Sequence, residues 1–303
     1  MDEDIGFIDA HHHFWDLDRL YYPFLQDVPP HPFFLGDQRP LAKTFLPDDY
    51  REAAKNHRVV GTVHVEAECD RAMQLQETEW LSALNAQFGL PNAIVAHVWF
   101  DDPAVEAKLG AHAEWRLFRG IRSKPVTASR PDEDVRGVRR SMQDPRWIAG
   151  FRRLADFNLS WDLRVPYWHL EEAARLAADH PDIPVVLNHT GFPWDRSEAG
   201  LARWRTGMRA LARVDHVSVK LSCVCVPGAP WTLGAHRDVI LEAIDLFGVS
   251  RCMFASNVPP DTLQVDYDSM LTAYKAMVAD LSFSDRQRLF HDNAKAFYRM
   301  ELE

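Results

Sequence analysis

Two kinds of segment alternate along almost the whole chain, and this alternation restricts the fold more than any other feature of the sequence. Eight short runs rich in β-branched and aromatic residues are separated by segments in which apolar residues recur at helical spacing. Strands that alternate with helices form a parallel sheet with right-handed crossovers. The expected strands are 6–15, 59–68, 92–100, 118–123, 159–165, 184–190, 216–222 and 252–257.

The number of strands and the length of the chain together favour a closed barrel. Eight strand–helix units in 303 residues are typical of one α/β fold, the (β/α)8 TIM barrel, although the pattern alone also permits an open, doubly wound sheet. We therefore predict a single barrel domain over residues 1–303, with a loop, 18–47, inserted after the first strand on the face where barrel active sites are built. Helices are expected over 70–88, 144–157, 167–180, 196–214, 234–247 and 261–281, and an extra C-terminal helix over 284–300.

Composition disfavours several classes of partner. The net charge is −10, with 34 basic and 44 acidic residues and no basic run, which argues against binding to nucleic acid. No apolar stretch approaches the roughly 20 residues that span a bilayer, and the first residues, MDEDIGF, lack the basic start of a signal peptide. None of the four cysteines forms a CxxC pair, so we expect buried free thiols. The sequence thus predicts a cytoplasmic protein with a small-molecule substrate and no membrane or nucleic-acid partner, and it leaves a homodimer open.

The first expected strand ends in three consecutive histidines. Side chains alternate across a strand, so His11 and His13 share one face and His12 takes the other. Two imidazoles so spaced on an inward face suit one divalent metal, and zinc accepts nitrogen ligands readily. The position of the pair at a strand end indicates a site rather than a histidine-rich turn.

Charged side chains recur near the ends of later strands. Within 62–66 we place the valines toward the helices, which turns His64 and Glu66 inward. The same alternation turns Arg122 and Asp162 inward, where an arginine could clamp a carboxylate. Three more polar residues lie in the last three strands: His189, Lys220 and Asn257.

A barrel brings these strand ends together around one cavity. Singly, each residue has a structural explanation, because a strand-end histidine is often part of the fold and Asp162 and Arg122 can form a buried ion pair. A core built for stability alone does not need so many titratable groups in one place. We therefore expect one active site, with aromatic side chains as candidates for its wall: Trp15, Tyr22, Phe34 and Trp231.

Several short motifs occur in the order found in one known group of barrels. The chain reads IDAHHHFW at 8–15 and YPFL at 22–25, then VEA at 65–67, RGIR at 119–122, NHTG at 188–191, KLS at 220–222 and FASNVP at 254–259. Together these motifs cover residues 6 to 299. They resemble the amidohydrolase-related (amidohydrolase 2) barrel hydrolases, in particular the branch of sugar-acid lactonases and 2-pyrone-4,6-dicarboxylate lactonase.

The resemblance implies a (β/α)8 barrel that hydrolyses a small ring, usually a lactone with carboxylate or hydroxyl groups. In metal-using relatives the residues that match His11 and His13 bind a divalent cation, and His189 matches the sixth-strand histidine of the family. A metal site of these three histidines, most simply for zinc, is therefore expected. Some members of the branch work without a metal, and that alternative stays open.

One position departs from the family pattern. The eighth strand normally ends in an aspartate that activates water, whereas this chain has Asn257, which has no basic lone pair at neutral pH. Three explanations are open: Glu66 is the base or a metal ligand while Asn257 orients water or substrate, Asp261 takes over as base, or activity is lost or proceeds without metal.

The leading prediction is hydrolysis of a small lactone or similar cyclic ester by activated water. The alternatives are a zinc-dependent decarboxylase of the related barrels and a non-catalytic barrel that binds a small acid. The catalytic candidates are Glu66, Asp162, His189 and Asn257, and the substrate-binding candidates are Arg122, Lys220, Trp15, Tyr22 and Trp231.

Overall fold

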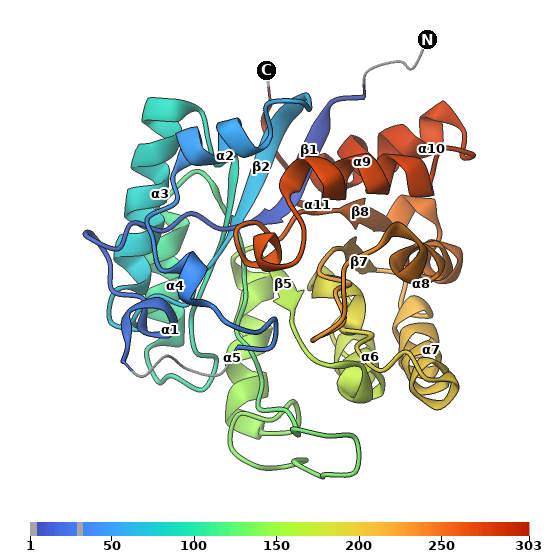
Figure 1. Ribbon diagram of the computed structural model, residues 1–303. Helices are drawn as coiled ribbons and strands as arrows, with labels where there is room; N and C mark the ends of the chain where they lie inside the picture. Colours follow the sequence, from blue (N-terminus) through green and yellow to red (C-terminus); the bar gives the residue numbers. More distant parts are fainter. Residues whose placement is uncertain (1–4, 29–32, 303) are drawn as a thin grey trace.

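Eight parallel strands form the centre of the computed structural model, which describes residues 5–28 and 33–302. They lie side by side in sequence order (Figure 1). Main-chain hydrogen bonds from Asn257 to His11 (2.7 Å) and from His13 to Val258 (2.8 Å) join the last strand to the first. The strands therefore form the predicted (β/α)8 barrel: β1 Phe7–His12, β2 Val59–Val65, β3 Ala93–Ala96, β4 Phe118–Ile121, β5 Ser160–Leu163, β6 Val185–Leu187, β7 Val217–Leu221 and β8 Cys252–Phe254.

Helices surround the strands on the outside of the barrel (Figure 1). Each helix predicted between strands is present with its ends shifted by a few residues, and the predicted C-terminal helix is divided by a π-helical turn, Arg288–Asp292, into α10 and α11. The predictions missed α1, α2 and α4. The helices are α1 Pro23–Gln26, α2 Pro47–Ala53, α3 Gln74–Phe88, α4 Val105–Ala113, α5 Pro145–Asp156, α6 Leu170–Ala178, α7 Glu198–Ala212, α8 Leu233–Phe247, α9 Tyr267–Met277, α10 Phe283–Gln287 and α11 Asn293–Phe297.

Side chains of the later strands alternate between an outer and an inner layer, as the sequence predicts. The Trp161 ring packs on Phe151 of α5, with ring centroids 5.0 Å apart, and Leu163 belongs to the same outer cluster. Asp162, between them, faces into the barrel, where its carboxylate meets Lys220 of β7 at 2.6 Å. Apolar side chains thus hold the helices to the sheet, and charged ones fill part of the interior.

The prediction for β2 was wrong. Val63 and Val65 pack in one buried cluster with Val186 of β6, so the valines fill the interior of the barrel. His64 faces α3 instead, and its Nε2 lies 3.9 Å from the carboxylate of Glu77. The interior of an eight-stranded barrel is narrow, and compact β-branched side chains fill it at close packing.

The extra C-terminal segment closes the barrel at the end where the strands begin. Ala294, Tyr298 and Met300 belong to the inner cluster, and the Tyr298 hydroxyl donates to Asp162 (2.8 Å). The other end of the barrel, where the strands finish, is the end at which loops gather and where the candidate site lies.

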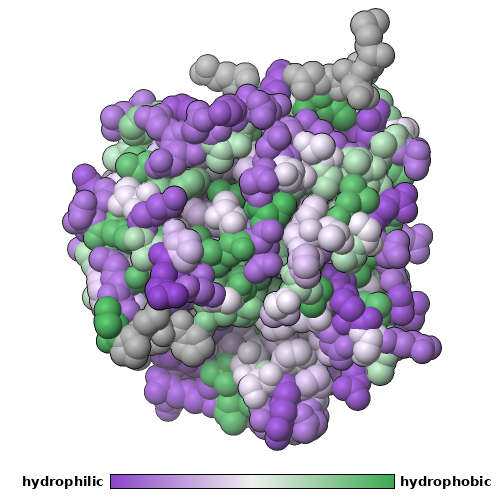
Figure 2. Space-filling model, in the orientation of Figure 1, coloured by the Kyte–Doolittle hydropathy of each residue, from purple (hydrophilic) through white to green (hydrophobic). Residues whose placement is uncertain are grey.

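The face in Figure 2 is largely hydrophilic, and hydrophobic residues gather near its centre. Among the described residues, no helix combines the length and the apolar character needed to cross a membrane.

Candidate active site

A pocket of about 370 Å³ lies where the C-terminal ends of the strands meet. Pockets near this size bind small molecules. Cationic, imidazole and aromatic side chains line it together, a mixture that suits a small polar ring. The lining residues are His13, Trp15, Phe24, Phe33, Phe34, Ala67, Glu68, Arg122, Lys124, Arg164, His189, Trp194, Asn257 and Pro260.

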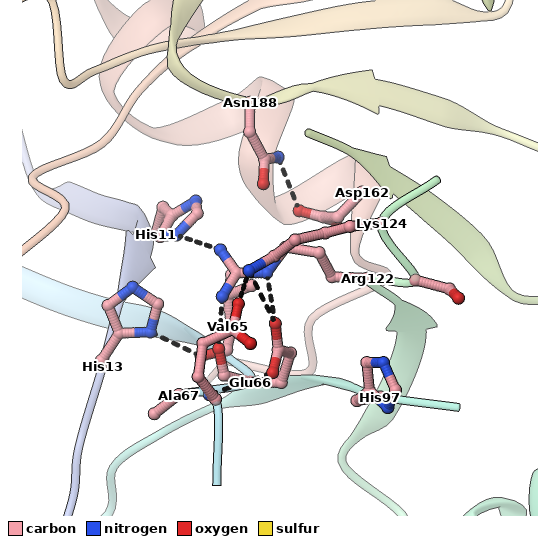
Figure 3. A network of polar contacts seen from close by, with 12 residues as sticks. His11, His13, Val65, Glu66, Ala67, His97, Arg122, Lys124, Asp162 and Asn188 are labelled. Atoms are coloured by element: carbon pink, nitrogen blue, oxygen red, sulfur yellow. Dashed lines mark hydrogen bonds and ion pairs between the residues drawn. The ribbon is translucent and has the colours of Figure 1, made fainter. Parts of the chain in front are cut away.

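His13 faces this pocket in a defined tautomer. Its Nδ1 lies 2.7 Å from the carbonyl oxygen of Val65, which can only accept, so Nδ1 carries the proton (Figure 3). The lone pair is therefore on Nε2. Burial and the positive charge of Arg122 lower the pKa of His13 well below its ordinary value, so the ring is neutral near pH 7 and Nε2 can accept a proton.

His11 lies between two cations. Its Nε2 is 3.5 Å from Nη1 of Arg122, and its Nδ1 is 3.5 Å from Nζ of Lys220. The ring centroid lies 5.0 Å from that of His13 and 4.6 Å from that of His189. Burial, followed by the charge of Lys220, lowers the pKa of His11 well below its ordinary value. The three histidines predicted as metal ligands thus lie close together, but each ring nitrogen of His11 has a cationic side chain beside it.

His189 reaches the pocket through an unusual backbone turn. Its φ of 58° and ψ of 34° lie in the left-handed region, which non-glycine residues seldom adopt and which recurs at functional sites. Nδ1 lies 3.1 Å from the hydroxyl oxygen of Ser222. Burial and the charge of Arg164 lower the pKa of His189 well below its ordinary value, so this ring is neutral as well.

Glu66 is engaged by cations rather than exposed to substrate. Its carboxylate accepts from Arg122 Nε (2.8 Å), from Arg71 Nη1 (2.9 Å) and from the main-chain N–H of Glu68 (3.0 Å). Burial alone raises the pKa of Glu66, but the charges of Arg122 and Arg71 outweigh it and hold the pKa well below its usual range. The oxygens of this carboxylate are occupied by these donors, so Glu66 is suited to anchor the arginines and not to take a proton from water.

Asp162 and Lys220 form a fully buried ion pair below the pocket. The two charged groups are 2.6 Å apart, and Asp162 also accepts from Asn188 Nδ2 (3.0 Å). Burial lowers the pKa of Lys220 to about 8, against the opposing effect of Asp162. Neither residue is among those that line the pocket, so the pair contacts the site through His11.

Asn257 is held by the acid that follows it four residues later. Its Nδ2 donates to Oδ1 of Asp261 (2.6 Å), which leaves the amide oxygen of this pocket residue as an acceptor. Asp261 is 1% exposed, and burial raises its pKa to about 7 against the effect of the Asn257 bond. Asp261 lies behind Asn257 and positions the amide.

The predicted aromatic wall is present in part. Trp15 and Phe34 line the pocket. Tyr22 is completely buried, and Trp231 stacks on His236 with ring centroids 4.9 Å apart. Neither of these two is a lining residue.

Sequence reasoning missed two basic residues, Lys124 and Arg164, that line the pocket. Each lies two positions after an inward residue that was recognised, Arg122 and Asp162 respectively. Continuing the strand alternation by one more step would have found both. Phe33, Glu68 and Trp194 come from loops and Phe24 from the short helix α1, outside the strands in which this period exists.

Comparison with known proteins tests the resemblance that the motifs show. The sequence profile of the amidohydrolase family matches residues 8–300. The chain belongs to the amidohydrolase family. This amidohydrolase is accordingly a hydrolase, and the resemblance noted from its motifs is confirmed.

Three relatives of this amidohydrolase cover nearly the whole chain. An uncharacterised protein of Sinorhizobium fredii, y4mH, is 39% identical over 98% of this chain and 99% of its own. An L-fucono-1,5-lactonase of Burkholderia multivorans is 27% identical over 97% of this chain and 96% of its own. A crystal structure of a Burkholderia multivorans amidohydrolase with bound zinc has a TM-score of 0.80 at 27% identity and covers 98% of this chain and 100% of that one.

Divalent metals serve many amidohydrolases, yet the donors in this pocket fit one poorly. Within residues 5–28 and 33–302, no three His, Cys, Asp or Glu side chains are arranged to hold a metal ion. Both ring nitrogens of His11 face a cation, and the carboxylate of Glu66 is bound to arginines. A divalent ion on the three histidines would lie beside fixed positive charges without a carboxylate to balance them. The mechanism proposed below therefore uses no metal.

Removal of metal is expected to leave hydrolysis intact. Protein prepared without a metal-affinity tag should contain less than stoichiometric zinc or manganese by elemental analysis, and its activity should survive dialysis against a chelator. One tightly bound metal per chain, lost together with activity and restored by zinc, would contradict this expectation.

Proposed function

We propose that this amidohydrolase opens a small lactone, or a similar cyclic ester, by attack of water on the ring carbonyl. The observation that carries the proposal is the neutral His13, whose Nε2 lone pair lies in a pocket that Arg122 and Lys124 also line. A neutral base next to fixed cations is what ester hydrolysis requires, because the base activates water and the cations stabilise the oxyanion. The L-fucono-1,5-lactonase relative supports the class of substrate.

The reaction needs one proton transfer at each stage. The water oxygen forms a bond to the carbonyl carbon while Nε2 of His13 takes the water proton. The carbonyl electrons move to oxygen, and the positive charge of Lys124 and the remaining Nη1 of Arg122 stabilise that oxyanion. Collapse of the intermediate breaks the ring C–O bond, and the imidazolium returns its proton to the leaving oxygen. The product is an open-chain hydroxy acid.

His189 and Asn257 orient the reacting groups in this proposal. If the Ser222 hydroxyl donates to Nδ1 of His189, the proton of this ring is on Nε2 and can be donated to the carbonyl oxygen. The Asn257 amide oxygen, fixed by the bond from Nδ2 to Asp261, accepts a hydrogen bond from the attacking water or from a ring hydroxyl. Positioning of this kind lowers the activation free energy of a reaction between two partners, by roughly 7–11 kcal/mol in favourable cases.

A panel of five- and six-membered lactones tests the proposal directly. The panel contains neutral sugar lactones and lactones that bear a carboxylate, and acid release is followed with a pH indicator after subtraction of spontaneous hydrolysis. Saturable hydrolysis of at least one ring, with one equivalent of acid per turnover, is expected. A folded protein that opens no member of the panel would contradict the proposal.

The pH profile should reflect Lys124. Burial and the neighbouring Arg164 lower the pKa of Lys124 to about 7, so this residue is charged below that pH and neutral above it. We expect kcat/KM to fall as pH rises through about 7, and we expect Lys124→Arg, which stays charged, to retain activity to higher pH. On the acid side, His13 and His189 stay neutral below pH 6.5 because their pKa values are lowered. If kcat/KM fell over the same alkaline pH range in wild type and in Lys124→Arg, Lys124 would be excluded as the group that titrates.

A further inference from the structure

One cation of the pocket, Arg164, has no carboxylate or hydrogen-bond partner among the residues that the structure describes. Arg164 directly follows β5 and lines the pocket, with its guanidinium carbon 4.9 Å from the ring centroid of Phe192 and 5.7 Å from that of Phe34. The two rings restrict a planar guanidinium and supply no hydrogen-bond acceptor in its plane. Among the described residues, no carboxylate lies within ion-pair distance of Arg164, and no acceptor for its five N–H donors is found.

The other cations around the site are already matched. Arg122 donates through Nε and Nη2 to Glu66, Arg71 bridges Glu66 and Glu68, and Lys124 contacts Glu68. Figure 3 shows the first of these networks, with Arg122 between His11 and Glu66. Arg122 therefore has little capacity left for the bidentate clamp that the sequence predicted, because two of its three nitrogens are used.

The cationic side chains around the pocket outnumber the carboxylates, which favours binding of an anion. Among the described residues, the carboxylates within ion-pair distance of Arg71, Arg122, Lys124 and Arg164 are those of Glu66 and Glu68, in a chain whose net charge is −10. Burial and the proximity of Arg122 lower the pKa of Arg164 to about 10, which reflects an environment short of negative charge. None of the Arg164 nitrogens is a fully buried polar atom without a hydrogen-bond partner. The nitrogens are therefore accessible from the pocket.

We propose that Arg164 binds a carboxylate that the substrate carries outside its reacting ring, and that the natural substrates are therefore anionic lactones rather than neutral sugar lactones. This inference rests on the proposed lactone hydrolysis for its reaction, but the anion subsite itself does not. A guanidinium fixed between two aromatic rings can bind a carboxylate through two parallel hydrogen bonds. Because Arg164 is close enough to His189 to lower the pKa of that ring, the carboxylate would lie near the reacting carbonyl and hold one end of the ring.

The test compares a carboxylated lactone with its methyl ester in wild type, Arg164→Gln and Arg164→Lys. Wild type should prefer the carboxylate, and Arg164→Gln should lose roughly 10- to 100-fold in kcat/KM for it, mainly through KM, while turnover of the methyl ester changes little. Arg164→Lys should recover part of the loss. Arg140→Gln is the matched control, since Arg140 also stacks on an aromatic ring, Trp99 at 4.2 Å, but lies outside the lining of the pocket.

A binding measurement separates this inference from the proposed reaction. The affinity for 2-furoate, a ring carboxylate without an ester to hydrolyse, is measured by calorimetry against that for neutral 2-furamide. Weaker furoate binding in Arg164→Gln, without a change for the amide, supports the subsite even if no lactone is opened. The inference is overturned if lactones are hydrolysed but Arg164→Gln keeps the wild-type preference for the carboxylated lactone and the wild-type affinity for furoate.

Discussion

Replacing His13 with alanine is expected to lower kcat for lactone hydrolysis by about 10²- to 10⁴-fold, the usual contribution of a general base. The reason is geometric, because the Val65 carbonyl fixes the proton on Nδ1 and leaves the Nε2 lone pair for water. KM should change less than kcat, since the lost interaction belongs to the transition state. Steady-state kinetics at saturating lactone provide the measurement.

A second histidine supplies the control. His180 has the same kind of bond, from Nδ1 to the Leu176 carbonyl (2.8 Å), but borders a hollow between α5 and α6 that shares no residue with the active-site pocket. His180→Ala should keep wild-type kcat. If His13→Ala retained turnover within about threefold of wild type, where a general base contributes 10² or more, another group would have to activate the water.

Breaking the buried ion pair should have the largest effect on stability. Lys220→Met leaves the Asp162 carboxylate without its cation at a position where both side chains are 0% exposed, so we expect a loss of about 3–5 kcal/mol in the free energy of unfolding. Asp162 keeps its bonds from Asn188 and Tyr298, which limits the loss. Urea denaturation of the variant and of wild type measures the difference.

Two further variants test the cause of that loss. Lys220→Met combined with Asp162→Asn removes both charges and should regain part of the stability, because an amide oxygen still accepts from Asn188 and Tyr298. Arg116→Met breaks an exposed pair with Glu301, whose side chains are 65% and 70% exposed, and should cost less than about 1 kcal/mol. Equal losses in Lys220→Met and Arg116→Met would show that burial does not determine the effect.

The strand pattern predicted the barrel and most of the inward residues because one face of each later strand is strongly apolar. Trp161 and Leu163 had to face the helices, and Asp162 between them therefore faced inward. The same rule failed at β2, because both faces of this strand are buried. The face with Val63 and Val65 turns into the barrel, and His64 on the opposite face turns toward α3. Alternation shows which residues share a face, but it does not show which face is the interior.

The partners of each site residue could not be predicted from spacing. Glu66 was a candidate base, but its carboxylate lies between Arg122 and Arg71. The structural alternative for Asp162 was an ion pair with Arg122, whereas the structure pairs Asp162 with Lys220. The pairs of Glu66 with Arg122 and of Asp162 with Lys220 join residues 56 and 58 positions apart in the sequence. The left-handed turn at His189 and the bond from Asn257 to Asp261 likewise depend on the backbone at strand ends, where periodicity stops.

The central claim is that water attacks the carbonyl carbon of a cyclic ester, and hydrolysis in water enriched in ¹⁸O tests it most directly. The lactone that the protein opens fastest is used, and mass spectrometry of the product is combined with an assay for carbon dioxide. We predict one ¹⁸O atom in the new carboxylate, none in the new hydroxyl, one equivalent of acid and no carbon dioxide. Release of carbon dioxide, or a label in the hydroxyl group, would contradict the account.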